Sequence, residues 1–85
     1  MKQPQVTIYG RTGCHLCENL VNSLRPLAEP LNFTLDLQQI DGNQELEALY
    51  GQLIPVVQID GKYFSHFTIN IEDFKSFLEK HRQHR

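Results

Sequence analysis

The chain has 85 residues, 40% of them hydrophobic, which is enough for one small core and one domain spanning residues 1–85. Its formal net charge is −2 and its only basic stretch is the tail 80–85, which argues against a nucleic-acid or anionic-membrane partner. No apolar segment approaches the roughly 20 residues of a membrane span, and residues 1–4 do not lead into a signal peptide, so we expect a cytoplasmic protein. We also expect it to be a monomer.

The first third of the chain predicts a strand followed by a helix. Residues 5–9 are mainly β-branched or aromatic and end at the breakers Gly10 and Gly13, as a strand does before a loop. From Cys14 onward, apolar residues recur every three or four positions, which is typical of an amphipathic helix, and Pro26 should kink or shorten it. The predicted buried stripe consists of Leu16, Leu20, Val21, Leu24, Leu27 and Ala28.

A second strand and a short helix are predicted in the middle of the chain. Residues 33–40 alternate apolar and polar side chains, which is the period of a half-buried strand. Asp41 or Asn43 is suited to cap a short helix that runs through residues 46–50 and ends at Gly51.

The last third of the chain predicts a hairpin and a final helix. Asp60-Gly61, a strong hairpin signal, joins residues 54–59 to residues 62–64. Asn70 is suited to cap a helix whose predicted buried face consists of Ile71, Phe74, Phe77 and Leu78. The resulting order, β-α-β-α-β-β-α, predicts an α/β fold with a mixed four-stranded sheet and helices on its faces.

The only two cysteines, Cys14 and Cys17, lie three positions apart at the predicted start of the first helix. Unpaired N–H groups and the positive end of the helix dipole stabilise a thiolate there, so Cys14 is the predicted nucleophile. Cys17 lies one turn further on, where it can attack a mixed disulfide on Cys14 and release the partner as a thiol. In a reducing compartment such a pair is typical of redox catalysis, redox sensing or metal binding rather than of a permanent cross-link.

Residues 9–18 (YGRTGCHLCE) and residues 54–62 (IPVVQIDGK), together with the order of the elements, resemble the thioredoxin superfamily and within it the small glutaredoxin-like proteins. The resemblance implies a thioredoxin-like fold and a dithiol–disulfide oxidoreductase, in which Cys14 attacks a protein or small-molecule disulfide and Cys17 resolves the mixed disulfide. It also implies that Pro55 is a cis-proline facing the cysteines and that the Ile54 backbone pairs with an extended substrate.

The resemblance further implies that glutathione or a thioredoxin-reductase system supplies the electrons, and no bound cofactor is expected. Glutathione-using glutaredoxins carry a Gly-Gly pair where this chain has Ser65-His66-Phe67, and these bulkier residues predict weak turnover with glutathione. The chain also contains no tryptophan, whereas classical thioredoxins carry one before the first cysteine.

Arg11 and His15 are the candidate cations near the cysteines. Arg11 keeps its charge at every working pH and is the predicted substrate-binding cation, although a plain loop residue is the alternative. His15 lies between the two cysteines and should point into solvent. Near the hairpin, His66 is expected to be a surface residue and Tyr63 a core residue, rather than catalytic ones.

Two other classes of function use the same residues. A zinc protein would combine Cys14 and Cys17 with His81 and His84, but the spacing of these histidines is shorter than zinc sites use. An iron–sulfur cluster shared between two chains would need two further ligands from a thiol cofactor, so no metal is expected. A binding module of the same fold would hold a partner without redox turnover, and it would keep its affinity after Cys14→Ser.

Overall fold

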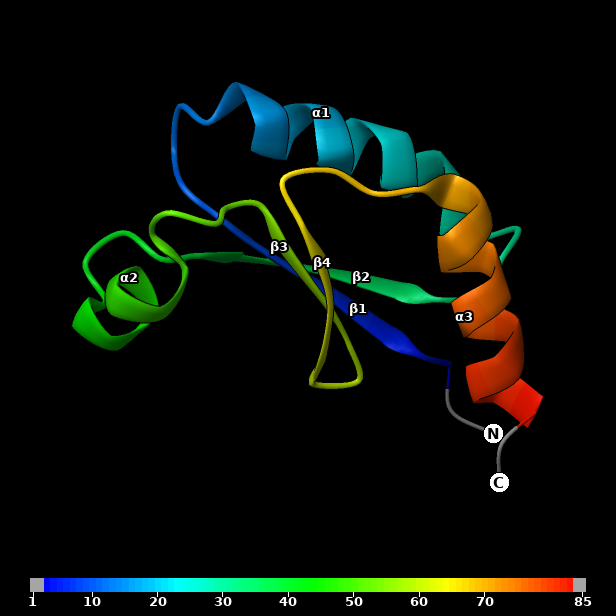
Figure 1. The fold of residues 1–85 in the computed structure, drawn as a ribbon. Coiled ribbons are helices and arrows are strands. Elements are labelled where there is room, and N and C mark those ends of the chain that lie inside the picture. The colour runs from blue at the N-terminus through cyan, green and yellow to red at the C-terminus, as the bar shows by residue number, and fades with distance from the viewer. Residues whose placement is uncertain (1–2, 84–85) are drawn as a thin grey trace.

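The computed structural model describes residues 3–83, with side chains up to residue 80, and shows a four-stranded sheet with helices on both faces (Figure 1). The β-α-β-α-β-β-α order predicted from the sequence is confirmed. The elements are β1 (Gln5–Gly10), α1 (His15–Leu24), β2 (Thr34–Gln39), α2 (Gln44–Tyr50), β3 (Val56–Ile59), β4 (Lys62–His66) and α3 (Ile71–Gln83).

The strands follow the spatial order β2-β1-β3-β4, so the first strand of the chain is one of the two central strands. β1 pairs in parallel with β2 and antiparallel with β3, and β3 pairs antiparallel with β4. The predicted mixed sheet is therefore confirmed. Within the central pair, Ile8 lies opposite Val57 and Tyr9 lies opposite Val56.

α1 and α3 cover one face of the sheet. Side chains alternate between the two faces of a strand, so Val6 and Ile8 of β1 point to the same side as their partners Ile59 and Val57 of β3. These four side chains are at least 98% buried. The helices and the loop before β2 complete this core with Leu20, Leu24, Phe33, Phe74 and Leu78.

α2 lies on the opposite face, at the end of the sheet where β1 stops (Figure 1). The Tyr50 ring packs against Tyr9 with centroids 5.0 Å apart, and the Tyr50 hydroxyl accepts a hydrogen bond of 2.9 Å from Gln58 Nε2. No residue of α2 is buried. This helix therefore contributes little to the core.

The local signals in the sequence act as expected. Pro26 ends α1 by one turn of 3₁₀ helix over Arg25–Leu27. Asp60 and Gly61 both have positive φ, which is typical of a tight hairpin turn. Asn43 and Asn70 accept hydrogen bonds from the N–H groups of Leu46 and Asp73, so both predicted amide caps are confirmed.

The boundaries of the hairpin strands differ from the prediction. β3 begins at Val56 rather than at residue 54, because Pro55 has no N–H to donate to a ladder. β4 continues past Phe64 to His66, where His66 still pairs with Val56. Among the described residues, no helix has both the length and the apolar composition needed to cross a membrane.

Candidate functional site

β1 delivers the chain to Cys14, which forms a disulfide with Cys17. Cys14 is the N-cap of α1, and its Sγ accepts a hydrogen bond of 3.1 Å from the backbone N–H of Cys17. The Cα atoms of the two cysteines lie 5.2 Å apart, within the range of ordinary disulfides. The two cysteines therefore lie together at the start of α1, where the sequence analysis places them, and their catalytic roles stay a prediction.

The two sulfurs differ in their access to solvent. Cys17 is only 7% exposed and belongs to the buried side of α1, whereas Cys14 is partly exposed. Gly10 makes the buried position possible, because a Cβ atom on this residue would lie 2.9 Å from Cys17 Sγ. An external partner therefore reaches Cys14 more easily than Cys17.

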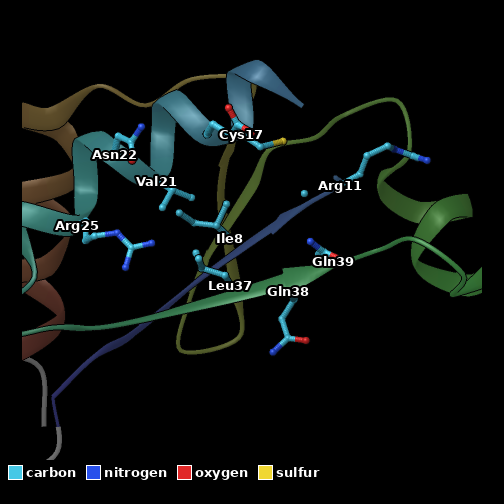
Figure 2. A pocket seen from close by; sticks show the side chains of 11 residues that line it. Ile8, Arg11, Cys17, Val21, Asn22, Arg25, Leu37, Gln38 and Gln39 are labelled. Carbon is cyan, nitrogen blue, oxygen red and sulfur yellow. The ribbon is translucent and has the colours of Figure 1, made fainter. Parts of the chain in front are cut away.

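Arg11 points away from the disulfide toward α2 (Figure 2). Its Nη1 atom lies 3.5 Å from Asp41 Oδ1 and 3.6 Å from Glu47 Oε1. Asp41 also accepts a hydrogen bond of 3.2 Å from the N–H of Thr12. The Asp41 carboxylate therefore contacts two consecutive residues of the loop that leads to Cys14. The role of Arg11 as a substrate-binding cation stays a prediction, whereas His15 is exposed as expected.

The Ile54–Pro55 peptide bond is cis, as the resemblance implies. Because Tyr9 pairs with Val56, the antiparallel register places Pro55 beside Gly10, at the edge of the sheet from which the cysteine loop leaves. Pro55 is buried and Ile54 is half-buried. Among the described residues, the N–H and C=O groups of Ile54 form no hydrogen bond.

A groove of about 370 Å³ lies between α1 and the edge strand β2, with Cys17 at one end and Arg25 at the other (Figure 2). Its floor is apolar and includes Ile8, Val21 and Leu37, and Leu37 is 46% exposed. Its rim is charged or polar. The groove gives Cys17 a neighbouring open space on the side of β2.

The end of β4 and the segment that follows it lie on the side of α1 opposite this groove. Tyr63 is 55% exposed and forms a hydrogen bond with His66 Nδ1, so neither residue belongs to the core. Phe67 follows with a positive φ of 67° and donates its N–H to the carbonyl of Pro55 at 2.9 Å. The Ser65-His66-Phe67 segment is thus hydrogen-bonded to the cis-proline through the Phe67 N–H.

The structure brings together no metal-ligand set in the part of the chain that it describes: no group of three or more histidine, cysteine or acidic side chains is placed to hold an ion. The side chain of His81 and all of His84, the remaining ligands of the zinc alternative, lie outside the described residues.

The family model described as a glutaredoxin-like domain matches residues 5–79, which includes both cysteines and Pro55. The chain belongs to the glutaredoxin-like domain family. An uncharacterized protein of Mycobacterium tuberculosis is 32% identical to this glutaredoxin-like chain over 75 residues, covering 82% of the chain and 77% of that protein.

Two solved structures show how widely the fold of this glutaredoxin-like domain is shared. A protein of Nitrosomonas europaea, solved by NMR in solution, is 33% identical with a TM-score of 0.80, and the match covers 91% of this chain and 93% of that chain. Thioredoxin of Fasciola hepatica is 22% identical with a TM-score of 0.66, covering 93% of this chain and 81% of that chain. The predicted thioredoxin-like fold is confirmed, and the fold with its Cys-x-x-Cys disulfide supports thiol–disulfide redox chemistry in general.

Three residues of the site escaped the sequence analysis. Gly10 was recognised only as a strand breaker, although its missing side chain makes room for Cys17. Asp41 was recognised only as a possible cap, and Glu47 was not singled out, although both pair with Arg11. The only signal for Gly10 is its place four residues before Cys14, and nothing local to Arg11 indicates its partners.

Proposed function

We propose that the protein is a dithiol–disulfide oxidoreductase in which Cys14 attacks the substrate and Cys17 resolves the mixed disulfide. The observation that carries this proposal is the unequal placement of the two sulfurs. Cys14 is partly exposed and caps α1, whereas Cys17 is 7% exposed beneath it. An attacking thiol needs access to its partner, and a resolving thiol needs access only to the first sulfur.

The reaction begins with the reduced protein. The Cys14 thiolate attacks one sulfur of a substrate disulfide, and the other substrate sulfur leaves as a thiolate that takes up a proton. Cys17 then loses its proton and attacks Cys14 Sγ, which releases the second substrate sulfur as a thiol. The substrate disulfide gains two electrons and two protons in total, and the protein dithiol is oxidised to the Cys14–Cys17 disulfide.

The backbone of α1 supports the thiolate state. The N–H of Cys17 already points at Cys14 Sγ at 3.1 Å, and the positive end of the helix dipole lies at the same position. A hydrogen bond to a charged sulfur is stronger than one to a neutral sulfur. The same N–H therefore favours Cys14 as the leaving group in the last step of re-reduction, when a second reductant thiol attacks the reductant sulfur of a mixed disulfide on Cys14.

The substrate and the reductant belong to the same proposal. The free peptide groups of Ile54, beside Pro55, suit an extended disulfide-containing partner, and Arg11 supplies a permanent cation on the loop before Cys14. Glutathione or a thioredoxin-reductase system would return the two electrons. We propose that the protein works as a monomer in the cytoplasm, without a bound cofactor.

The test compares Cys14→Ser with Cys17→Ser in the reduced protein. We expect iodoacetamide to label wild-type Cys14 quickly below about pH 7.5, where an ordinary thiol with a pKa of about 8.5 is mostly protonated. Cys14→Ser should abolish this labelling and all disulfide reduction. Cys17→Ser should keep the fast labelling and accumulate a covalent mixed disulfide with the substrate, which mass spectrometry detects.

Two results would contradict this proposal. Faster labelling of Cys17 than of Cys14 would reverse the roles of the two thiols. If the wild type never reduces a disulfide, and Cys14→Ser still binds the same partner, the protein is instead a binding module.

A further inference from the structure

The groove between α1 and β2 takes no part in the proposed reaction, although Cys17 lines it. Cys17, Val21 and Arg25 follow one another at intervals of four residues, so they form one row along the helix wall. From Cys17 to Arg25 this row spans eight residues of helix, about 12 Å. The groove is therefore elongated, with a sulfur at one end and a guanidinium at the other (Figure 2).

The middle of the groove is apolar. Ile8 and Leu37 lie side by side in the parallel ladder of β1 and β2, so their side chains point to the same face of the sheet, where Val21 lines the helix wall. Ile8 is only 2% exposed, whereas Leu37 is 46% exposed because β2 is an edge strand. An aliphatic chain that lies on Leu37 would remove this apolar surface from water.

The two ends of the groove carry opposite charges. The guanidinium of Arg25 is turned toward the groove (Figure 2) and forms no ion pair with any of the described residues. Glu18 lines the other end, beside Cys17. Arg11 also lines the groove, but its charge is already paired with two carboxylates near α2. An anion is therefore attracted to the Arg25 end and disfavoured at the Cys17 end.

We infer that the groove is a binding site for a linear aliphatic carboxylate, with the carboxylate at Arg25 and the chain along Leu37 toward Cys17. A guanidinium binds a carboxylate through two parallel hydrogen bonds. A zigzag chain of about eight to ten carbons, with bonds of about 1.5 Å, matches the length of the groove. The groove volume of about 370 Å³ also lies within the range of about 300–1,000 Å³ that small-molecule sites occupy. The inference goes beyond the proposed function and does not depend on it.

The experiment titrates the oxidised protein with three probes and follows its backbone amides by NMR. Octanoate has the predicted chain and charge, octanamide has the same chain without the charge, and butanoate has the charge with a short chain. We expect octanoate to shift the amides of residues 17–25 and 37–39, which line the groove. Octanamide should bind about three- to fivefold more weakly, as the loss of one exposed ion pair allows. Butanoate should bind at least about tenfold more weakly, because it lacks four methylene groups.

Two variants test the groove, and each has a matched control. Arg25→Gln removes the cation, so it should weaken octanoate to the affinity of octanamide and leave octanamide unchanged. Leu37→Thr keeps a residue suited to a strand but removes apolar surface, so octanoate and octanamide should both bind about threefold more weakly. Lys75→Gln and Leu49→Gln replace an exposed cation and an exposed leucine outside the groove, and both should keep the wild-type affinities.

Protection of the cysteines from iodoacetamide locates the far end of the chain. In reduced Cys14→Ser, saturating octanoate should slow the labelling of Cys17 several-fold, because the chain ends against this side chain and labelling follows exposure. In reduced Cys17→Ser, octanoate should leave the labelling rate of Cys14 unchanged, since Cys14 does not line the groove.

An affinity that depends on chain length and on Arg25, with protection of Cys17 alone, supports the inference. The absence of a saturable shift at millimolar octanoate would overturn it, and so would equal binding of octanoate and octanamide or shifts centred on another surface. Octanoate binding that survives both Arg25→Gln and Leu37→Thr would also overturn it, as would equal protection of the two cysteines, which indicates non-specific association. None of these results decides the proposed function, which the disulfide-reduction experiments test separately.

Discussion

The sulfur of Cys14 caps α1, and in the proposed reaction the same sulfur is the attacking atom. A helix cap normally uses an oxygen of serine, threonine, asparagine or aspartate. Here a sulfur accepts the N–H of Cys17 instead. Any change in the charge or bonding of this sulfur therefore acts directly on the first turn of the helix, and a thiolate is the better acceptor for that N–H.

Gly10 is a sensitive position of the site, because even one added methyl group should disturb the cysteine pair. In Gly10→Ala the new methyl group would lie 2.9 Å from Cys17 Sγ and 3.1 Å from Cys17 Cβ. We expect the free energy of unfolding to fall by about 1–3 kcal/mol, as for other overpacked cores. Urea denaturation of the reduced protein measures this loss, and Ser76→Ala on the exposed side of α3 is the control.

A double-mutant cycle identifies the cause of that loss. If the Cys17 sulfur causes the overlap, Cys17→Ala should relieve part of the damage from Gly10→Ala, with a coupling of about 1 kcal/mol. Additive effects under reducing conditions would mean that the alanine disturbs the strand end and not the cysteine.

At the residue scale, the sequence predicted those site residues that are neighbours along the chain. Cys14 and Cys17 share one helical turn, so their spacing alone predicts their pairing. Arg11 meets Asp41, 30 residues away, and Glu47, still further along the chain, only because the sheet brings the ends of β1 and β2 together. Contacts of this kind depend on strand register, which local patterns do not encode.

At the scale of elements, α2 and α3 begin with the same cap but are anchored very differently. Asn43 Oδ1 accepts the N–H of Leu46, and Asn70 Oδ1 accepts the N–H of Asp73, each at 3.0 Å. α3 inserts Phe74 into the core, whereas α2 buries no residue. Loss of the cap should therefore have global consequences for α3 and local consequences for α2.

Alanine substitution of the two caps tests this difference. Asn70→Ala should lower the global free energy of unfolding by about 1 kcal/mol, the usual cost of a lost cap. Asn43→Ala should leave the midpoint of urea denaturation nearly unchanged but should speed amide hydrogen exchange within residues 44–50. Equal losses of global stability in the two variants would show that α2 unfolds together with the core.

The sequence predicted the type and order of every element, since each has its own local signal. Asp60-Gly61 indicates the hairpin, Pro26 indicates the end of α1, and Asn70 indicates the start of α3. The extension of β4 to His66 and the turn at Phe67 were not predicted. Both depend on pairing with Val56 and Pro55, and a phenylalanine is not a residue that indicates positive φ.

At the scale of the whole molecule, an aromatic cluster around Phe74 ties the helices to the sheet within the larger aliphatic core. Phe74 is fully buried, and its ring meets the edges of Phe33 and Phe64 at centroid distances of 5.3 and 6.0 Å. Such ring pairs contribute about 0.5–1.5 kcal/mol beyond the buried area. The cluster joins α3, the loop before β2 and β4.

Phe74→Ala should therefore cost about 3–5 kcal/mol, a large part of the stability that a domain of this size has. Phe74→Leu keeps most of the volume and should cost less. The measurement is the free energy of unfolding in urea, with Leu49→Ala on the exposed side of α2 as the control. A loss below about 1 kcal/mol for Phe74→Ala would show that the core collapses around the gap.

The central position of β1 also has a consequence for synthesis of the chain on the ribosome. β1 pairs with β2 on one side and with β3 on the other, so its two ladders are complete only after residues 56–59 have emerged. The chain grows at about 5–20 residues per second, and Cys14 and Cys17 emerge more than 35 residues earlier. During those seconds the nascent chain carries its two thiols without the packing that later shelters Cys17. The thiols are then at their most accessible to oxidants and to other nascent chains.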